Sequence, residues 1–377
     1  MNFVISSSEL LSKLQVVGRV IATKNTLPIL DDFLFDVTGK TLTIKASDLE
    51  TTILSRSELI NVDGNGTIAV EAKRLQEIIR EFSEQPLTFI IDEKNLSVEI
   101  QSQYGKYSLV GHPADDFPKT PHLKKSETQE VKLSGDLLYT GLSMTYYATA
   151  NDELRPAMNG IFIETDKNAI TFVATDAQKL VRYQRKDILT EVVSSVILPK
   201  KPTTLLRNVL QKFDKDVTMQ MDKNNASFNA GDYTIFCRLV DANYPAYNSV
   251  IPKQNPNKLV VDRIEFLNTM KRVSVFSNPA TNLIRLAISG NSVEISAEDL
   301  DNALSAVEHV NCQYEGEPIV IGFRSSYFLE LLTNLTCTEV RIELSEPNRA
   351  GLIFPAEPED ENEDILMLLM PMMLVQS

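Results

Sequence analysis

Apolar and polar positions along the first third of the chain alternate between two periods. Leu10, Leu14 and Val17 recur at helical spacing, and Ser7 or Ser8 is expected to cap that helix. Short runs that alternate apolar and polar residues follow and predict strands. The expected elements are helices over 8–20 and 72–82 and strands over 33–37, 41–44, 51–54 and 67–70. This third of the chain is therefore predicted to be an α+β domain.

The same order of elements returns twice more. A helix-opening motif reads Glu9-Leu10-Leu11, Asp136-Leu137-Leu138 and Glu265-Phe266-Leu267, at offsets of 127 and 129 residues. Each copy also has an aspartate after a short strand and an aliphatic strand that runs into proline: Asp48, Asp176 and Asp299, then Pro118, Pro245 and Pro371. A period of this length is a whole domain, because solenoid repeats have periods of tens of residues.

We therefore predict three tandem α+β domains, over 1–122, 128–252 and 253–377, each with two helices backed by antiparallel sheets. The second copy is expected to have helices near 135–147 and 203–213 and strands at 160–164 and 169–174. Linkers are expected at 119–128 and 252–258, and the acidic segment 357–364 is expected to be a solvated loop.

Composition narrows the class of protein. The net charge is 37 minus 51, or −14, which favours solubility and argues against a uniformly basic nucleic-acid-binding surface. Cys237, Cys312 and Cys337 are odd in number and far apart, which fits a reducing cytoplasm better than a disulfide framework. No signal peptide is visible, and the apolar run 365–375 is far shorter than the roughly 20 residues of a membrane helix. A cytoplasmic protein without membrane contact is expected.

Catalytic and cofactor motifs are not found. The chain has no phosphate-binding glycine loop, because Gly64 and Gly66 fall in a hairpin turn. His112, His122 and His309 have no partner at metal-ligand spacing. The repeated aspartates Asp48, Asp176 and Asp299 are better explained by hydrogen bonds within turns than by an acid site. We therefore expect no enzyme activity, no cofactor and no metal.

Basic residues recur on the predicted helices. Lys73, Lys201 and Arg324 open the second helix of each copy, and Lys24 follows the first helix. Further cations on the first helices are Lys13, Arg19, Lys271 and Arg272. Each alone could be an ordinary solvated side chain. If the helices share one surface, however, an acidic protein could bind phosphate backbone through a positive strip without reading bases.

Together these residues resemble the bacterial DNA polymerase sliding clamp family, the β subunit of DNA polymerase III. The motifs that carry the resemblance are Thr26-Leu27-Pro28-Ile29-Leu30, Ser47-Asp48-Leu49-Glu50, Pro113-Ala114-Asp115-Asp116-Phe117-Pro118, Asn159-Gly160, Val173-Ala174-Thr175-Asp176, Leu239-Val240-Asp241 and Met370-Pro371-Met372. They span all three copies. The resemblance implies a head-to-tail homodimer that closes into a ring around duplex DNA. It also implies a processivity function, in which the ring slides on DNA and tethers the replicative polymerase.

The resemblance further implies three sets of site residues. Those toward DNA are Lys24, Lys73, Asp152, Pro156, Ala157, Lys201 and Arg324. A hydrophobic cleft between the second and third domains would bind short peptides of the polymerase catalytic subunit, the clamp loader and repair proteins. Its lining is Met158, Thr175, Ala177, Gln178, Lys179, Leu180, Pro245, Val250, Tyr327, Asn348, Met370, Pro371, Met372, Met373 and Leu374. The dimer contact would join Tyr107 and Leu109 to Val275 and Phe276 of the second chain.

The chain departs from the common pattern of the family at several of these places. Asp152 and Pro156-Ala157 stand where a polar residue and two tyrosines are common. Gln178-Lys179 replaces a common His-Arg pair, and Ser249 replaces a common arginine. Val375, Gln376 and Ser377 extend beyond the usual leucine end. Two alternatives stay open: a three-domain scaffold that never closes into a ring, and an enzyme whose site lies between domains.

Overall fold

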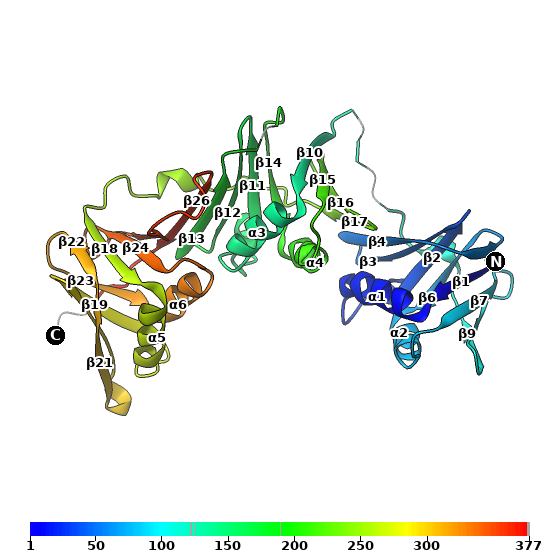
Figure 1. Ribbon diagram of the computed structural model, residues 1–377, viewed down its shortest axis with the longest axis horizontal. Helices are drawn as coiled ribbons and strands as arrows, with labels where there is room; N and C mark the ends of the chain where they lie inside the picture. The colour runs from blue at the N-terminus through cyan, green and yellow to red at the C-terminus, as the bar shows by residue number, and fades with distance from the viewer. Residues whose placement is uncertain (121–122, 125, 189, 375–377) are drawn as a thin grey trace. The chain divides into compact units, whose positions relative to one another are not determined.

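The structure is a computed structural model that describes residues 1–120, 123–124, 126–188 and 190–374 (Figure 1). His122 and the tail 375–377 lie outside the described residues. Contacts divide the chain into two compact units. Unit 1 comprises Met1–Thr140 and Pro199–Leu239, and unit 2 comprises Gly141–Leu198 and the described residues from Val240 onward. The second copy of the repeat is therefore shared between the units, which the sequence did not predict.

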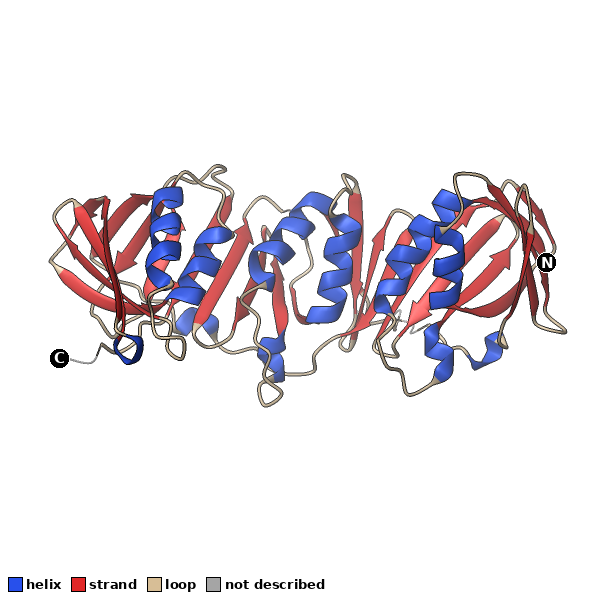
Figure 2. Cartoon of the chain, turned by 90° about the horizontal axis from the view of Figure 1, so that it is seen from below, coloured by secondary structure: helices blue, strands red, loops and turns tan. Residues whose placement is uncertain are grey.

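Six α-helices lie within the described residues. They are α1 (Ser7–Val17), α2 (Ala72–Arg80), α3 (Gly135–Tyr146), α4 (Lys200–Leu210), α5 (Arg263–Ser274) and α6 (Ser325–Thr333). The pairs α1–α2 and α5–α6 each lie side by side against strands, near the N-terminal and C-terminal ends of the chain (Figure 2). Two helices per copy were predicted, and the prediction is confirmed. The fourth helix begins at Lys200, three residues before its expected start.

Unit 1 contains two antiparallel sheets. The first has strand order β5-β1-β7-β8-β9, and the second has order β10-β15-β16-β17-β4-β3-β2-β6. The strands of the first repeat are β1 (Asn2–Ser6), β2 (Asp32–Thr38), β3 (Thr41–Ser47), β4 (Thr51–Glu58), β5 (Asn61–Asp63), β6 (Gly66–Glu71), β7 (Pro86–Asp92), β8 (Ser97–Gln101) and β9 (Lys106–Val110). Those of the second repeat in this unit are β10 (Gln129–Ser134), β15 (Asp216–Met221), β16 (Asn225–Ala230) and β17 (Tyr233–Arg238).

Unit 2 contains a nine-stranded sheet, β14-β11-β12-β13-β26-β25-β24-β18-β22, and a four-stranded sheet, β21-β20-β19-β23. From the second repeat come β11 (Gly160–Asp166), β12 (Ala169–Thr175), β13 (Lys179–Arg185) and β14 (Ser194–Pro199). From the third come β18 (Asn257–Asp262), β19 (Leu283–Ser289), β20 (Ser292–Asp299), β21 (Leu304–Asn311), β22 (Gln313–Glu315), β23 (Ile319–Arg324), β24 (Glu339–Leu344), β25 (Gly351–Pro355) and β26 (Glu363–Leu369).

The first helix of each repeat has the same N-terminal cap. Ser6 accepts a hydrogen bond from the Glu9 N–H, and Asp262 accepts one from the Glu265 N–H. In the second repeat, Ser134 accepts from the Leu137 N–H at 3.2 Å. These caps satisfy N–H groups that have no partner inside the helix. The expected cap at Ser7 or Ser8 is therefore wrong by one or two residues. The helices start at Ser7, Gly135 and Arg263, a constant spacing of 128, so Asp136 is equivalent to Ser8 and not to Glu9.

Aromatic side chains fill the core of each unit. In unit 1, Phe3 and Phe89 stack with ring centroids 4.9 Å apart. In unit 2, Phe328 makes edge contacts with Phe266 and Phe323, at 5.7 and 5.3 Å. All five rings are almost wholly buried, and burial of such side chains is worth about 1.5–3 kcal/mol each.

The domain limits predicted above stay predictions.

Candidate functional site

Two turns have the same hydrogen bonds in the first and second repeats. Asp48 accepts hydrogen bonds from the N–H groups of Glu50 and Thr51, at 3.1 and 2.7 Å. Asp176 accepts them from Gln178 and Lys179, both at 2.9 Å. The residue after each aspartate is left-handed, with φ of 80° at Leu49 and 75° at Ala177. The interpretation of these aspartates as turn residues is therefore confirmed for Asp48 and Asp176.

The first of these turns joins the first repeat to the second within unit 1. Strand β4 pairs antiparallel with β17 of the next repeat, with Thr51 opposite Cys237 and Ser55 opposite Tyr233. The Arg238 N–H donates to the Glu50 carbonyl at 2.9 Å.

Two lysines cross the same junction. The Lys201 ammonium donates to the Val20 carbonyl at 2.6 Å and to the Asp48 carboxylate. Lys13 pairs with Asp232 at 2.6 Å, and 9% of its side chain is exposed. These two cations therefore hold two repeats together, and Lys13 does not lie on a solvated helix face as the sequence suggested.

The second turn joins the second repeat to the third within unit 2 in the same way. Strand β13 pairs antiparallel with β26, with Lys179 opposite Leu369. The Met370 N–H donates to the Gln178 carbonyl at 2.8 Å. The Lys179 ammonium, with only 5% of its side chain exposed, lies 3.2 Å from Asp176 and 2.7 Å from Glu330 of α6. It also lies over the Tyr327 ring at 4.4 Å. The Lys179 side chain is therefore paired with protein groups beside the predicted cleft and does not face solvent.

One face of the β13–β26 junction carries an apolar cluster that is separate from the main core of unit 2. The cluster consists of Val173, Leu180, Tyr247, Ala350, Leu352, Leu366 and Leu368, with Phe162, Tyr244, Ile251 and Phe354 partly buried against it. We call this set the apolar floor. Paired strands give the equivalent residues of the β4–β17 junction: Lys45 for Val173, Thr52 for Leu180, Ser227 for Leu352, Thr234 for Leu366 and Phe236 for Leu368. Four of these five are polar, so this face is apolar at the β13–β26 junction and mostly polar at the β4–β17 junction.

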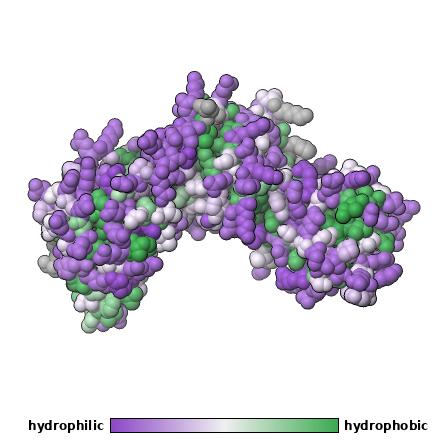
Figure 3. All heavy atoms as spheres, viewed as in Figure 1, coloured by the Kyte–Doolittle hydropathy of each residue, from purple (hydrophilic) through white to green (hydrophobic). Residues whose placement is uncertain are grey.

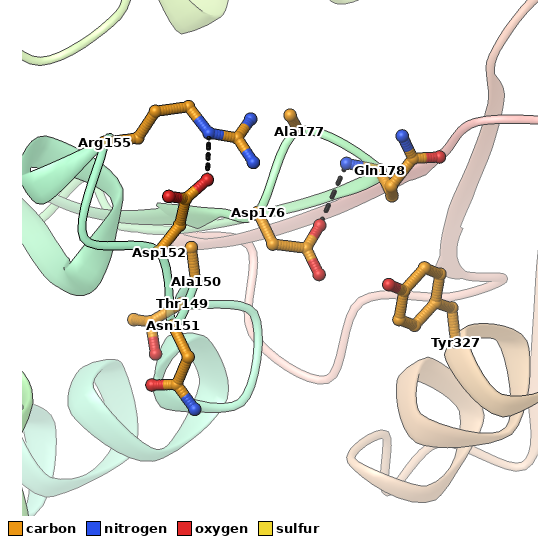
Figure 4. A pocket seen from close by; sticks show the side chains of 9 residues that line it. All are labelled: Thr149, Ala150, Asn151, Asp152, Arg155, Asp176, Ala177, Gln178 and Tyr327. Atoms are coloured by element: carbon orange, nitrogen blue, oxygen red, sulfur yellow. Dashed lines mark hydrogen bonds and ion pairs between the residues drawn. The ribbon is translucent and has the colours of Figure 1, made fainter.

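A polar pocket of about 360 Å³ adjoins this junction. It is lined by Thr149, Ala150, Asn151, Asp152, Arg155, Asp176, Ala177, Gln178 and Tyr327. Figure 4 shows Tyr327, on α6, facing the turn of Asp176 across the pocket. At the rim, the Arg155 Nε donates to Asp152 at 2.7 Å, and this bond is the main reason why the pKa of Asp152 lies below its ordinary value. Of the predicted cleft residues, Ala177, Gln178 and Tyr327 line this pocket, whereas Leu180 belongs to the apolar floor.

The C-terminal residues run along the same region. Met370 and Met373 are exposed, with 39% and 79% of their surface accessible. The Met372 N–H donates to the Gly322 carbonyl at 2.8 Å, and Leu374 packs beside Gly322. A β-carbon at Gly322 would lie 2.8 Å from Leu374, so glycine allows the tail its close approach.

The segment before β26 is the largely exposed loop that the sequence predicted, over residues 357–362, whereas the last two residues of the acidic run begin β26. Arg185 pairs with Asp360 at 2.8 Å, and Arg182 and Lys186 pair with Asp364 at 2.9 and 3.0 Å. Burial alone would raise the pKa of Asp364, but these two cations lower it. Two of the acids, Asp360 and Asp364, are therefore tied to β13 and the residue after it through ion pairs, which the charge run alone did not reveal.

The predicted DNA-facing residues differ in their surroundings. Lys24 and Lys73 are exposed, and neither forms an ion pair within the residues that the structure describes. Lys201 is equivalent to Lys73, because each is the second residue of its helix. Arg324 is not equivalent to them: it is the N-cap residue of α6, one place before the first helical residue, and it lies over the Tyr327 ring at 5.4 Å. The expected correspondence of the three cations is therefore wrong for Arg324. Pro156 and Ala157 begin a short 3-10 helix, Pro156–Asn159, which follows the ion-paired Asp152.

Of the four predicted dimer residues, two lie on an unpaired sheet edge and two follow a helix. Tyr107 and Leu109 are on β9, the edge strand of the five-stranded sheet in unit 1, and Tyr107 packs edge-on against Phe82 at 5.1 Å. Val275 and Phe276 follow α5 in unit 2, with 75% and 37% of their surface accessible. The four-stranded sheet of that unit has β21 as an edge strand, on which Leu304 and Val307 are exposed, and Leu300 is exposed in the short 3-10 helix before it. Apolar side chains gather at the free tip of the β20–β21 hairpin in Figure 3.

No group of His, Cys, Asp and Glu suited to a metal ion occurs among the described residues. Within the same residues, no helix is long and apolar enough to cross a membrane. Burial raises the pKa of all three cysteine thiols, which makes them poor nucleophiles at neutral pH.

The three-fold repeat agrees with the domains of a known family. The sequence matches the N-terminal domain of the DNA polymerase III beta subunit over residues 1–121, its central domain over 132–246 and its C-terminal domain over 248–373. These define a replication clamp of three tandem domains. The chain belongs to the DNA polymerase III beta subunit family, the beta sliding clamps, which are non-catalytic subunits of the replicative polymerase.

Relatives and solved structures match over nearly the whole chain. The beta sliding clamp of Pseudomonas putida is 30% identical over 99% of this chain and 100% of its own length. That of Bacillus subtilis is 26% identical over 98% and 99%. The crystal structure of the Pseudomonas aeruginosa clamp bound to griselimycin superposes with a TM-score of 0.93 at 27% identity, over 99% of this chain and 100% of that one. The Bacillus subtilis clamp gives 0.92 at 26% identity, over the full length of both chains.

Sequence reasoning missed two groups of residues at these sites. Glu330, Asp48 and Val20 complete the cation bridges across the junctions, and Tyr244, Ile251 and Phe354 widen the apolar floor. The bridges join residues about 150 or more positions apart in the sequence, so no local pattern identifies them. Tyr244 and Ile251 could have been noticed as apolar side chains in the segment that precedes the linker 252–258.

Proposed function

We propose that two copies of this chain close head to tail into a ring that encircles duplex DNA and tethers other replication proteins. The observation that carries the proposal is the pair of unpaired edges, β9 in unit 1 and β21 in unit 2. Unpaired edge strands with exposed apolar side chains promote association, and proteins ordinarily cover or protect them. Mutual pairing of β9 with β21 of a second copy satisfies both edges at once. Such heterologous contacts either close into a ring or continue as a filament.

Solution mass tests the dimer. Sedimentation equilibrium is expected to give a single species of twice the 42.2 kDa chain mass. A monomer at micromolar concentration would instead favour the open three-domain scaffold, and a broad series of masses would indicate a filament.

Toward DNA, we propose contacts with the phosphate backbone and none with base edges. The support is the exposed position of Lys24 and the absence of a groove-reading motif in the sequence. Lys201 and Arg324 add positive charge, although both also contact protein groups. Asp152 is ion-paired with Arg155, and Pro156 and Ala157 are uncharged. These three residues therefore add no positive charge to the proposed DNA surface. A sliding protein benefits from such sequence-independent binding.

Replacing Lys24 with Met is expected to weaken binding to duplex DNA most at low salt. The slope of log binding constant against log salt should become less steep by about 0.9, the value for one lost phosphate contact on B-form DNA. Fluorescence anisotropy over a salt series measures this slope. The exposed Lys94, in the β7–β8 turn, gives the matched control Lys94→Met, which should keep the wild-type slope. An unchanged slope for Lys24→Met would remove Lys24 from the DNA surface.

For the other partners, we propose that the cleft binds an extended apolar peptide segment of each client. The clients implied by the family are the replicative polymerase catalytic subunit, the clamp loader and repair proteins. Support comes from the apolar floor, the adjoining polar pocket and the exposed Met370 and Met373. Methionine is flexible and polarizable, so it suits a surface that accepts several different peptides. Rim contacts with the peptide are proposed for Pro245, Val250, Asn348 and Met158.

The cytoplasmic location of the protein stays a prediction.

A further inference from the structure

We infer that the polar pocket beside the Asp176 turn binds the ammonium group of a client lysine. The inference rests on the proposed binding of client segments at the β13–β26 junction and names one side chain that such a segment presents there. It comes from the first internal junction, where a lysine of this chain occupies the corresponding place. The pocket has a volume of about 360 Å³, with the Asp176 turn on one side and Tyr327 on the other (Figure 4).

The first junction contains an ammonium group bound at an aspartate turn. The Lys201 ammonium donates to the Val20 carbonyl at 2.6 Å and to the Oδ2 atom of Asp48. The Oδ1 atom of Asp48 accepts the N–H groups of Glu50 and Thr51. One carboxylate oxygen therefore stabilises the turn, while the second oxygen and a carbonyl near the end of the first helix bind the lysine. An ammonium group has three N–H donors and suits two acceptors of this kind.

The second junction has the same two acceptors. Ala148 is equivalent to Val20, because the helices that precede them begin 128 residues apart. The Asp176 turn has the hydrogen bonds of the Asp48 turn, and the two aspartate side chains are 15% and 14% exposed. Oδ1 of Asp176 accepts both N–H groups of its turn, so Oδ2 corresponds to the oxygen that binds Lys201 in the first junction.

The second junction lacks the lysine itself. Lys201 is the second residue of α4, whereas the second residue of α6 is Ser326. Ser326 is exposed, and its side chain is too short to extend to the turn as lysine does. The next residue, Tyr327, lines the pocket together with the Asp176 turn. The pocket therefore lies where the Lys201 side chain extends in the first junction, between the aspartate turn and the start of the helix.

The two nearby cations do not take the place of that lysine. The Lys179 ammonium approaches Asp176 to 3.2 Å, but it donates to Glu330 at 2.7 Å and lies over the Tyr327 ring. Arg324 also lies over this ring, and it forms no ion pair within the described residues. Two carboxylates therefore share one ammonium group. A further ammonium group in the pocket would give Asp176 a cation of its own, as Asp48 has in the first junction.

The rest of the pocket suits a lysine from a client segment. At the rim, Asp152 is paired with Arg155 at 2.7 Å, so this pair adds no net charge that would repel a cation. Gln178 lines the pocket, and Leu180, two residues further along the chain, belongs to the apolar floor. The pocket is thus continuous with the proposed client site. A lysine can pack its aliphatic stem against such a surface while its ammonium group pairs with Asp176.

A lysine supplied by the chain itself tests the ammonium site without any client. Ser326→Lys should pair with Asp176 as Lys201 pairs with Asp48, and should raise the midpoint of thermal unfolding by about 2–4 °C. The control Ser326→Met has a long uncharged side chain and should not. In an Asp176→Asn background, which keeps an oxygen for the turn N–H groups, the gain from Ser326→Lys should vanish. Equal midpoints for Ser326→Lys and Ser326→Met in calorimetry would overturn the site.

Paired peptides test the client lysine. A fluorescent polymerase-derived peptide carries lysine at each of its polar positions in turn, and each version is compared with one that carries uncharged norleucine there. At one position the lysine peptide should bind the parent protein on the order of tenfold more tightly, because it gains a charged hydrogen bond. High salt should reduce this preference. Ser326→Lys should abolish it, because the pocket is then filled, while the norleucine peptide keeps its parental affinity.

The outcomes separate the lysine site from the cleft. Equal affinities for every lysine and norleucine pair would overturn the client lysine and leave the cleft intact. A preference that survives in Ser326→Lys would overturn the assignment to this pocket. Failure of all peptides to bind would overturn the proposed cleft and the client lysine together, even with the Ser326→Lys gain in stability. Saturable binding of putrescine to the parent but not to Ser326→Lys, with equal peptide affinities, would make a free polyamine the ligand.

Discussion

Replacing Phe276 with Asp is expected to convert the dimer into folded monomers. Phe276 is part-exposed in the single chain, while its equivalents Val20 and Ala148 are fully buried at the internal junctions. In the ring it would become buried, and leaving a carboxylate there without a partner costs roughly 3–5 kcal/mol. Because it lies at a chain surface, the monomer itself should keep its fold. Sedimentation equilibrium together with circular dichroism measures both properties.

The matched control is Ile60→Asp, which introduces the same charge at an apolar side chain that is 85% exposed and precedes β5, the edge of the five-stranded sheet opposite β9. This variant should stay dimeric. A dimer of parental stability in Phe276→Asp would show that the joint lies elsewhere. Loss of helical signal would show that Phe276 supports its own domain instead.

Removing residues 372–377 is expected to abolish most binding to a short polymerase-derived peptide while leaving a folded dimer. Only the Met372 hydrogen bond to Gly322 and the packing of Leu374 tie this part of the described tail to β23. Extended peptides depend on a few apolar anchors in a desolvated pocket, and loss of such an anchor costs about 2 kcal/mol or more, a factor above tenfold. Titration of a fluorescent peptide measures the affinity.

Val250→Asp gives an independent test, because Val250 is 57% exposed and its replacement should not disturb folding. It should lower the peptide affinity to a similar degree, whereas Val193→Asp, at an exposed site in the β13–β14 connection, should not. Parental affinity in both the truncation and Val250→Asp would disprove the cleft assignment. A monomeric truncation would mean that the tail is structural.

The sequence predicted the repeated architecture because each copy has its own hydrophobic periodicity. Leu10, Leu14 and Val17 recur as Phe266, Met270 and Val273 in the third copy, and all six are buried in helices. Helix periodicity is local, so it needs no knowledge of the neighbouring repeat. Turn chemistry was equally readable, because an aspartate after a strand bonds to N–H groups two and three residues later.

The parts that could not be predicted depend on pairing between repeats. Nothing in the β4 sequence indicates that this strand pairs with β17, some 180 residues later, since strand pairing is decided by tertiary structure. For the same reason Lys201 reads as an exposed cation until Asp48 and Val20 are placed beside it. Arg324 was misplaced by two positions relative to Lys73 and Lys201, because sequence alone did not show where α6 begins.

Retention on DNA of different topology tests the central claim most directly. The protein, loaded on a nicked circular plasmid and isolated by gel filtration at moderate salt, should stay with the DNA. Cutting the plasmid once with a restriction enzyme should release it, because a ring held by topology slides off a free end, whereas backbone contacts survive the cut. Equal retention on circular and linear DNA, or rapid loss from both, would contradict a closed sliding ring.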